Sequence, residues 1–225
     1  LGAREGRFGR RGEKKSMQPF AASSIPLVTL GTFLLWFGWF GFNGFSQLAM
    51  GTFDDVNAIS KIAVNTHLAG AAGTVTGAAL TRLIGGKTDI VMMLNGALAG
   101  LVAITAEPLT PGPITAMVIG SIGAVIMYYG TKLLENLGLD DVVGAIPVHM
   151  FAGIFGTLVV PLTNADTSFG TQLIGVISVC IFSFVLSWIT FSTLKSTVGL
   201  RISRAAEKQG TDKAEVGVIA YSIRD

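Results

Sequence analysis

The segment FGWFGFNGFS, residues 37–46, places four phenylalanines, one tryptophan and three glycines around a single asparagine. It lies in a run without any charged residue that extends from residue 16 to residue 53. This run is much longer than the apolar core of a secretory signal peptide, which has about 7–15 residues. The run therefore predicts a membrane-spanning helix. We expect that helix to start near Pro26, because proline suits the first turn of a helix.

The composition of the whole chain agrees with a protein embedded in a membrane. Half of the residues are hydrophobic, 13% are charged, and the mean hydropathy is +0.62. A soluble domain usually carries about 25% charged residues. The net charge of +2 gives no reason to expect a nucleic-acid partner. The single cysteine, Cys180, excludes both an intramolecular disulfide framework and a cysteine-based zinc site.

Charge-free stretches divide the chain into six candidate spans, since a helix crosses the hydrocarbon core in about 17–25 residues. The sequence EPLTPGP, residues 107–113, separates the third stretch from the fourth, because prolines interrupt a helix. We therefore predict an all-α membrane protein with six transmembrane helices. The six stretches cover residues 16–53, 62–81, 90–106, 108–131, 142–165 and 167–194.

Basic residues predict how these spans are oriented in the membrane, because Lys and Arg are enriched in cytoplasmic loops. Fifteen of the sixteen basic residues fall before the first span, in alternate loops, or after the last span, and Lys61 is the exception. The predicted organisation is a cytoplasmic loop at 1–18, a transmembrane domain at 19–195 and a cytoplasmic tail at 196–225. Both ends of the chain are thus expected in the cytoplasm.

Ionisable residues inside spans are functional candidates, because they are costly to bury in lipid. The spans hold two of them, His67 and His149. A neutral imidazole offers one donor and one acceptor, so His149 suits either a small polar solute in an apolar passage or a hydrogen bond to a neighbouring helix. For His67, nearer the end of its span, we expect a packing role. No metal site, cofactor site or enzyme signature accompanies either histidine.

The remaining polar residues of the spans are expected to tie helices together, as Asn, Ser and Thr commonly do. This default applies to every one of them, and Ser46 has no base near it in the sequence that would activate it. The set comprises Asn43, Ser46, Asn65, Thr66 and Asn95.

Five ordered motifs resemble the ammonium transporter family (Amt/Mep/Rh), in particular its Amt branch. They are LGTFLLWFGWFGFNG (30–44), NTHLAGAAG (65–73), LNGALAGLVAITA (94–106), DDVVGAIPVH (140–149) and TVGLR (197–201). The chain differs from the usual pattern at Phe45 and Met150. The resemblance implies a fold of eleven helices built from two inverted repeats, of which this chain would supply the second repeat, the last helix and the tail.

The resemblance also implies roles for individual residues. Phe42 would help to block the external entrance of a pore, Ser46 would recruit ammonium there, and His149 would be one of two pore histidines. His67 does not match that histidine pair and stays structural, as do Asn43, Asn65, Thr66 and Asn95 by the packing default. In the tail, the family's regulatory motif would include Gly210, Asp212, Gly217 and Tyr221. No catalytic residue or cofactor is implied.

The expected function is transmembrane transport, in which ammonium is recruited and deprotonated and ammonia passes a hydrophobic pore, with methylammonium as an analogue. The resemblance implies a homotrimer in the plasma membrane and a possible cytoplasmic regulatory protein at the tail. Two alternatives are an ammonium sensor that signals through the tail and a membrane scaffold whose polar residues only pack. Because the chain starts at Leu1 with a basic stretch, residues 4–15, we also expect it to be part of a longer protein.

Overall fold

A computed structural model describes residues 2–8 and 20–220, and the regular elements in these residues are helical. The chain divides into two compact units. The first, called here the bundle unit, comprises Ser24–Leu133 and Asp141–Val176. The second, called the terminal unit, comprises Leu1–Ser23, Leu134–Asp140 and Ile177–Asp225.

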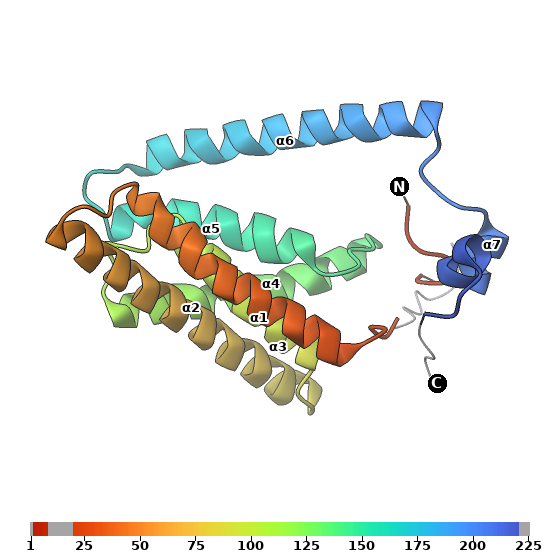
Figure 1. Cartoon of the computed structure of the whole chain (residues 1–225), viewed down its shortest axis with the longest axis horizontal. Coiled ribbons are helices and arrows are strands. Elements are labelled where there is room, and N and C mark those ends of the chain that lie inside the picture. The colour runs from red at the N-terminus through yellow and green to blue at the C-terminus, as the bar shows by residue number, and fades with distance from the viewer. Residues whose placement is uncertain (1, 9–19, 221–225) are drawn as a thin grey trace. The chain divides into compact units, whose positions relative to one another are not determined.

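The helices follow the order of the predicted spans, and Figure 1 shows α1 to α5 of the bundle unit side by side. The order confirms an all-α chain. The elements are α1 (Ile25–Gly44), the short turn η1 (Phe45–Gln47), α2 (Phe53–Gly85), α3 (Ile90–Ile104), α4 (Pro113–Leu137), a π-helical turn η2 (Ile146–Phe151), α5 (Ala152–Val159), the turn η3 (Val160–Leu162), α6 (Phe169–Thr197), α7 (Arg204–Gln209) and a second π-helical turn η4 (Asp212–Val216).

The ends of the helices follow from local chemistry. The hydroxyl of Ser24 caps α1, and Pro26 lies in its first turn, as the sequence predicts. The break between α3 and α4 falls where the three prolines predict it. In contrast, α2 is 33 residues long and starts well before the charge-free stretch, because Thr52 and Asp55 form a capping box ahead of it.

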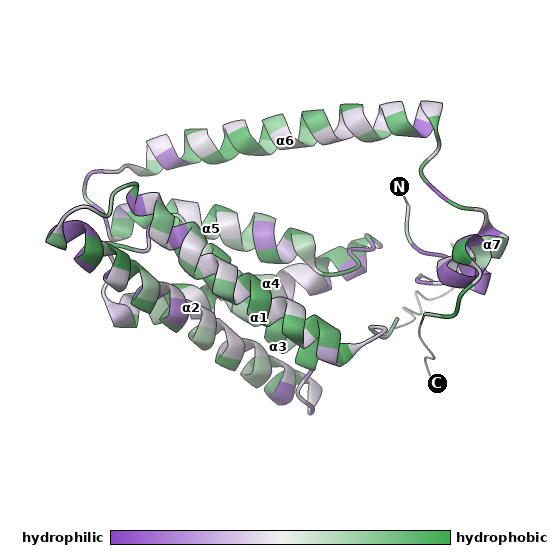
Figure 2. Ribbon diagram, viewed as in Figure 1, coloured by the Kyte–Doolittle hydropathy of each residue, from purple (hydrophilic) through white to green (hydrophobic). Residues whose placement is uncertain are grey.

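Three helices in the described part of the chain are long and apolar enough to cross a membrane: Ile25–Gln47 with its terminal turn, α4 and α6. Figure 2 shows α6 as hydrophobic along nearly its whole length and α7 as largely hydrophilic. Two further apolar helical segments, Ile90–Ile104 and Ile146–Leu162, are shorter. The number of six transmembrane spans stays a prediction.

Glycines bring the backbones of α2 and α3 into direct contact. A methyl group added at Gly73 would overlap the carbonyl oxygen of Gly96, and one added at Gly100 would overlap the carbonyl oxygen of Ala69. Gly120 of α4 approaches the same Ala69 carbonyl in the same way. In lipid the hydrophobic effect does not drive helices together, so they associate through close van der Waals packing, and small residues permit that packing.

We predict that Gly73→Leu separates α2 from α3 and destabilises the bundle unit. Overpacking typically costs about 1–3 kcal/mol, and here the overlapped atom is backbone that cannot move aside. The matched control is Gly175→Leu on α6, where an added side chain meets open space. Thermal unfolding of the two variants in detergent measures the difference, and equal melting temperatures would contradict the close contact.

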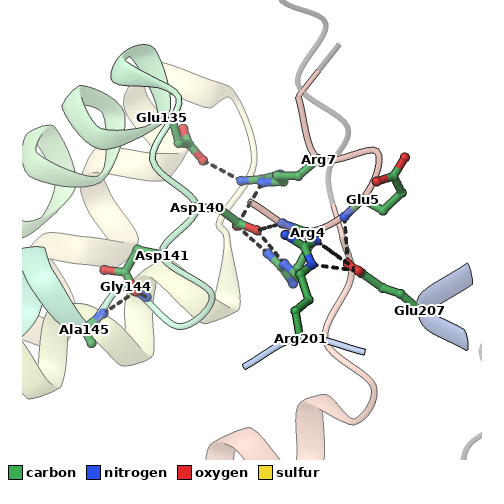
Figure 3. A network of polar contacts seen from close by, with 10 residues as sticks. All are labelled: Arg4, Glu5, Arg7, Glu135, Asp140, Asp141, Gly144, Ala145, Arg201 and Glu207. Atoms are coloured by element: carbon green, nitrogen blue, oxygen red, sulfur yellow. Dashed lines mark hydrogen bonds and ion pairs between the residues drawn. The ribbon is translucent and has the colours of Figure 1, made fainter. Parts of the chain in front are cut away.

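In the terminal unit, Asp140 organises the N-terminal segment. Its carboxylate accepts hydrogen bonds from the backbone N–H of Arg4 (2.9 Å) and from the Arg4 guanidinium (2.8 Å for each of two nitrogens). Arg7 lies 3.6 Å from the same carboxylate and pairs with Glu135 at 3.2 Å. The side chain of Asp140 is only 3% exposed. Figure 3 shows these groups converging on Asp140.

A second ion pair in the terminal unit lies between Arg201 and Glu207, with a shortest N–O distance of 2.9 Å. Glu207 also accepts the backbone N–H of Glu5 at 2.8 Å. Asp140 thus holds Arg4 by its backbone and by its charge, whereas Glu207 holds Glu5 by its backbone N–H alone. Charge-assisted hydrogen bonds of this kind are stronger than neutral ones.

We predict that the order of residues 2–8 depends on the ionised form of Asp140. Hydrogen bonds from Arg4 hold the pKa of this carboxyl below its ordinary value, with burial acting in the opposite direction. A lowered folded pKa means that the stabilisation is complete above the unfolded pKa of about 3.9 and is lost as the pH falls through the folded pKa.

Asp140→Asn should therefore remove at neutral pH the same negative charge that strong acid removes by protonating Asp140, and the N-terminal segment should lose its order. Hydrogen bonds to charged groups contribute about 1.5–3 kcal/mol, so the amides of residues 4–8 should exchange with deuterium at least about tenfold faster. Asp166→Asn removes the same charge from a loop of the bundle unit and serves as the control. Unchanged exchange in Asp140→Asn would show that these ion pairs do not order the segment.

Candidate functional site

The bundle unit contains a pocket of about 570 Å³ between α1, the end of α3, the η2 turn and α5. Its wall is mostly apolar, as is usual for pockets that enclose small molecules. Phe42 and His149, which are far apart in the sequence, both line it. The other lining residues are Leu34, Leu35, Gly38, Trp39, Val102, Thr105, Ala106, Gly153 and Thr157.

His149 lies in the π-helical turn η2, ahead of α5. Single π turns within helices are rare and occur frequently at functional sites. Here the backbone N–H of Ala152 donates to the carbonyls of Pro147 and His149, which joins the turn to α5. Among the described residues that line the pocket, His149 is the only ionisable side chain.

Asp141 fixes the start of the helical segment that carries His149. Its two carboxylate oxygens accept the backbone N–H groups of Gly144 (3.1 Å), Ala145 (3.0 Å) and Ile146 (2.7 Å); Figure 3 draws Asp141 beside two of these residues. An anion at this position also interacts favourably with the positive end of the helix. Asn95 of α3 supports the same loop, because its side-chain amide donates to the carbonyl of Val143 at 3.0 Å.

Trp39, which also lines the pocket, is fixed by hydrogen bonds. Its indole N–H donates to the hydroxyl of Thr105 at 2.7 Å, and that hydroxyl donates to the carbonyl of Leu101 at 2.7 Å. The ring centroids of Trp39 and Phe42 are 6.1 Å apart in a tilted arrangement. Because both donors are satisfied within the protein, the Trp39–Thr105 pair presents mainly apolar surface to the pocket.

Sequence reasoning missed Trp39, Thr105 and Thr157 as parts of this wall. The position of Trp39 could have been predicted from the sequence. Trp39 precedes Phe42 by three residues, and residues three apart on a helix share a face. The two threonines come from α5 and from the end of α3. No spacing in the sequence relates those positions to residue 42.

Ser46 does not line the pocket. It lies in the η1 turn after α1, and its hydroxyl donates to the carbonyl of Phe42 at 3.0 Å. Phe45 in the same turn is 76% exposed, and Phe42 is 66% exposed. The structure therefore places Phe42 and His149 together, and it places Ser46 one helical turn beyond Phe42.

Three of the polar residues predicted to be structural connect helices in the bundle unit. The side-chain amide of Asn43 donates to the hydroxyl of Thr66 at 2.9 Å, which ties α1 to α2 in a buried position. Asn65 donates to the carbonyls of Pro108 (2.9 Å) and Pro111 (2.8 Å). This amide therefore supplies donors to two backbone carbonyls of the proline-rich loop.

His67 contacts α1 through its ring. Its centroid is 5.4 Å from that of Trp36 and 6.2 Å from that of Phe40, with the second pair stacked. Within the described part of the chain its side chain has no hydrogen-bond partner, and the residue is exposed. These contacts and this exposure set His67 apart from His149, which lines the pocket.

The tail residues form a compact turn. Gly210 and Gly217 have positive φ angles of 94° and 74°, which glycine adopts without strain. Between them, the Asp212 carboxylate accepts the backbone N–H of Ala220 at 2.9 Å, and this bond is the main cause of the lowered pKa of Asp212. Tyr221 lies outside the described residues.

Comparison with known proteins gives consistent matches over nearly the whole chain. The family model described as the Ammonium Transporter Family matches residues 1–221. The chain is 40% identical to the Ammonium transporter Amt2 of Archaeoglobus fulgidus, over 98% of this chain and 50% of that protein. It is 30% identical to Ammonium transporter 3 of Dictyostelium discoideum, over 98% of this chain and 56% of that protein. The chain thus spans about half the length of the curated relatives that it matches.

Solved structures give the same result. The structure named Sensor Amt Protein superposes with a TM-score of 0.86 at 33% identity, over 95% of this chain and 54% of that one. A crystal structure of Candida albicans Mep2 superposes with a TM-score of 0.73 at 27% identity, over 85% of this chain and 45% of that one. With a family model that covers residues 1–221, the chain belongs to the ammonium transporter family.

Proposed function

We propose that this chain supplies half of a transmembrane pathway for ammonium, and that the pocket at His149 is part of that pathway. The observation that carries the proposal is that Phe42 and His149 line the same apolar pocket. The names of the relatives, which are ammonium transporters, support the substrate.

The chemistry of the wall suits passage of ammonia rather than of a hydrated ion. Burying a charge without a partner is very costly, so an apolar pocket opposes potassium and other metal cations. Ammonium differs from them because it can give up a proton and continue as a neutral molecule. We infer that ammonium gives up its proton to water on the outer side of Phe42, near Ser46, and that the imidazole of His149 then offers ammonia a hydrogen-bonding site.

The same proposal assigns a location to each part of the chain. Residues 19–195 would form the transmembrane domain, with residues 1–18 and 196–225 in the cytoplasm of a plasma-membrane protein. The protein would act as a homotrimer, and a cytoplasmic regulatory protein would bind the tail. Positive residues at both ends of the chain support this orientation.

The test uses a chimera in which the preceding half of Archaeoglobus fulgidus Amt2 is placed ahead of Leu1, expressed in cells that lack ammonium transporters. We expect the chimera to restore growth on limiting ammonium and to take up methylammonium. His149→Ala should lower methylammonium uptake roughly tenfold, because one hydrogen-bonding site worth about 1.4 kcal/mol is removed from the path.

The matched control is Met150→Ala, which truncates the neighbouring side chain of the same turn outside the pocket wall. It should keep uptake close to that of the unaltered chimera. A chimera that is folded and inserted but moves neither ammonium nor methylammonium would refute the transport proposal. Equal uptake by His149→Ala and Met150→Ala would remove His149 from the pathway.

A second candidate function is that of an ammonium sensor that signals through the tail. The similarity to the solved Sensor Amt Protein favours it, and so does the ordered turn that Gly210, Asp212 and Gly217 form. In a sensor, substrate binding at the pocket would alter this tail, and flux would not be needed.

Flux through the reconstituted chimera separates the two functions. A transporter should move methylammonium at a steady rate across proteoliposomes, whereas a pure sensor should bind it and show no sustained flux. Hydrogen exchange of residues 210–220 with and without methylammonium gives the complementary readout, since a sensor requires protection of the tail to change on binding.

A further inference from the structure

Thr157 of α5 lines the same pocket as His149 and contributes a hydroxyl group to it. It follows His149 by eight residues, which corresponds to roughly two helical turns. The two side chains therefore lie at different depths of one pocket. A solute that passes through the pocket would meet them one after the other.

Close packing of α5 against α3 fixes the level at which Thr157 lies. A methyl group added at Gly156 would overlap the carbonyl oxygen of Ala103, so the two backbones are in direct contact there. Thr157, the next residue of α5, is thus held beside the end of α3, where Thr105 also lines the pocket. The orientation proposed above places this end of α3 on the outer side of His149.

The hydroxyl proton of Thr157 is already used within the protein. The hydroxyl donates to the carbonyl of Gly153, one turn earlier in α5, at 3.0 Å. A hydroxyl group has one donor and two acceptor lone pairs. Among the described residues no second hydrogen bond reaches this group, so Thr157 can act toward a solute only as an acceptor.

The other polar side chains of the pocket offer fewer acceptor positions. Trp39 has a single polar group, its indole N–H, and this donates to Thr105. The Thr105 hydroxyl accepts that bond and donates to the carbonyl of Leu101, which leaves one lone pair. A neutral His149 has one acceptor nitrogen. Among the described side chains that line the pocket, Thr157 therefore has the most acceptor positions open.

We propose that the Thr157 hydroxyl is a second hydrogen-bonding site of the pathway, which accepts an N–H group of ammonia or methylamine on the outer side of His149. This inference rests on the proposed transport function and adds a specificity-determining residue to it. A polar group that enters an apolar pocket without a hydrogen bond loses free energy of hydration. An acceptor at Thr157 lowers that loss for solutes with N–H donors, before they reach the imidazole.

The test measures binding and flux separately on the chimera described above. A scintillation proximity assay with radiolabelled methylammonium gives the dissociation constant whether or not the protein transports. Thr157→Val keeps the shape of the side chain and removes both lone pairs, so the dissociation constant should rise about fivefold, the usual contribution of one neutral hydrogen bond. Thr157→Ser returns the hydroxyl and should restore the affinity.

The matched control is Thr74→Val in α2. The Thr74 hydroxyl makes the same kind of bond within its helix, to the carbonyl of Gly70 at 2.8 Å, and Thr74 does not line the pocket. Thr74→Val should bind methylammonium as the unaltered chimera does. The comparison separates the loss of an acceptor in the pocket from the loss of a hydroxyl bond within a helix.

The outcomes distinguish this inference from the transport proposal. Equal dissociation constants for Thr157→Val and Thr74→Val, absence of saturable binding, or failure of Thr157→Ser to restore affinity would each overturn the role of Thr157, and steady flux through the chimera would leave transport intact. Weaker binding in Thr157→Val alone, in a chimera that shows no flux, would support Thr157 as a binding residue and refute transport.

Discussion

The direct backbone contact between α2 and α3 is the constraint on which the rest of the bundle unit depends. Gly73 and Gly96 meet with no room for a side chain, and Gly100 meets the Ala69 carbonyl in the same way. This contact fixes α3, and α3 in turn carries Thr105 at one wall of the apolar pocket and Asn95 beneath the loop that leads to His149. A lateral shift of α3 would therefore move both walls of the pocket at once.

Satisfaction of polar groups is the second constraint, because the low-dielectric interior makes each unpaired group costly. At two points where the backbone loses its regular partners, side chains supply the missing bonds. Asn65 supplies donors to two carbonyls of the proline-rich loop, and Asp141 accepts three N–H groups ahead of the π-helical turn. These bonds allow an irregular backbone beside the pocket, where His149 is presented.

Much of the architecture could be predicted from the sequence. Charge-free stretches and prolines located the helices, and Pro26 marked the start of α1. The extent of α2 could not be predicted in this way, because the capping box at Thr52 and Asp55 carries the helix through charged residues. At the candidate site, Phe42 and His149 were identified by resemblance to a family. Trp39 and Thr105 were not, since the hydrogen bond that makes them one wall joins two helices.

The sequence alone determined that the chain is helical, that it is built for a membrane and to which family its motifs belong, because composition, periodicity and local capping act over a few residues. The tertiary structure alone decided which side chains share a cavity. Whether His149 shares a pocket with Phe42 depends on which helices pack together and at what rotation. That arrangement is set by glycine contacts and buried amides between segments far apart in the chain, and no local pattern encodes it.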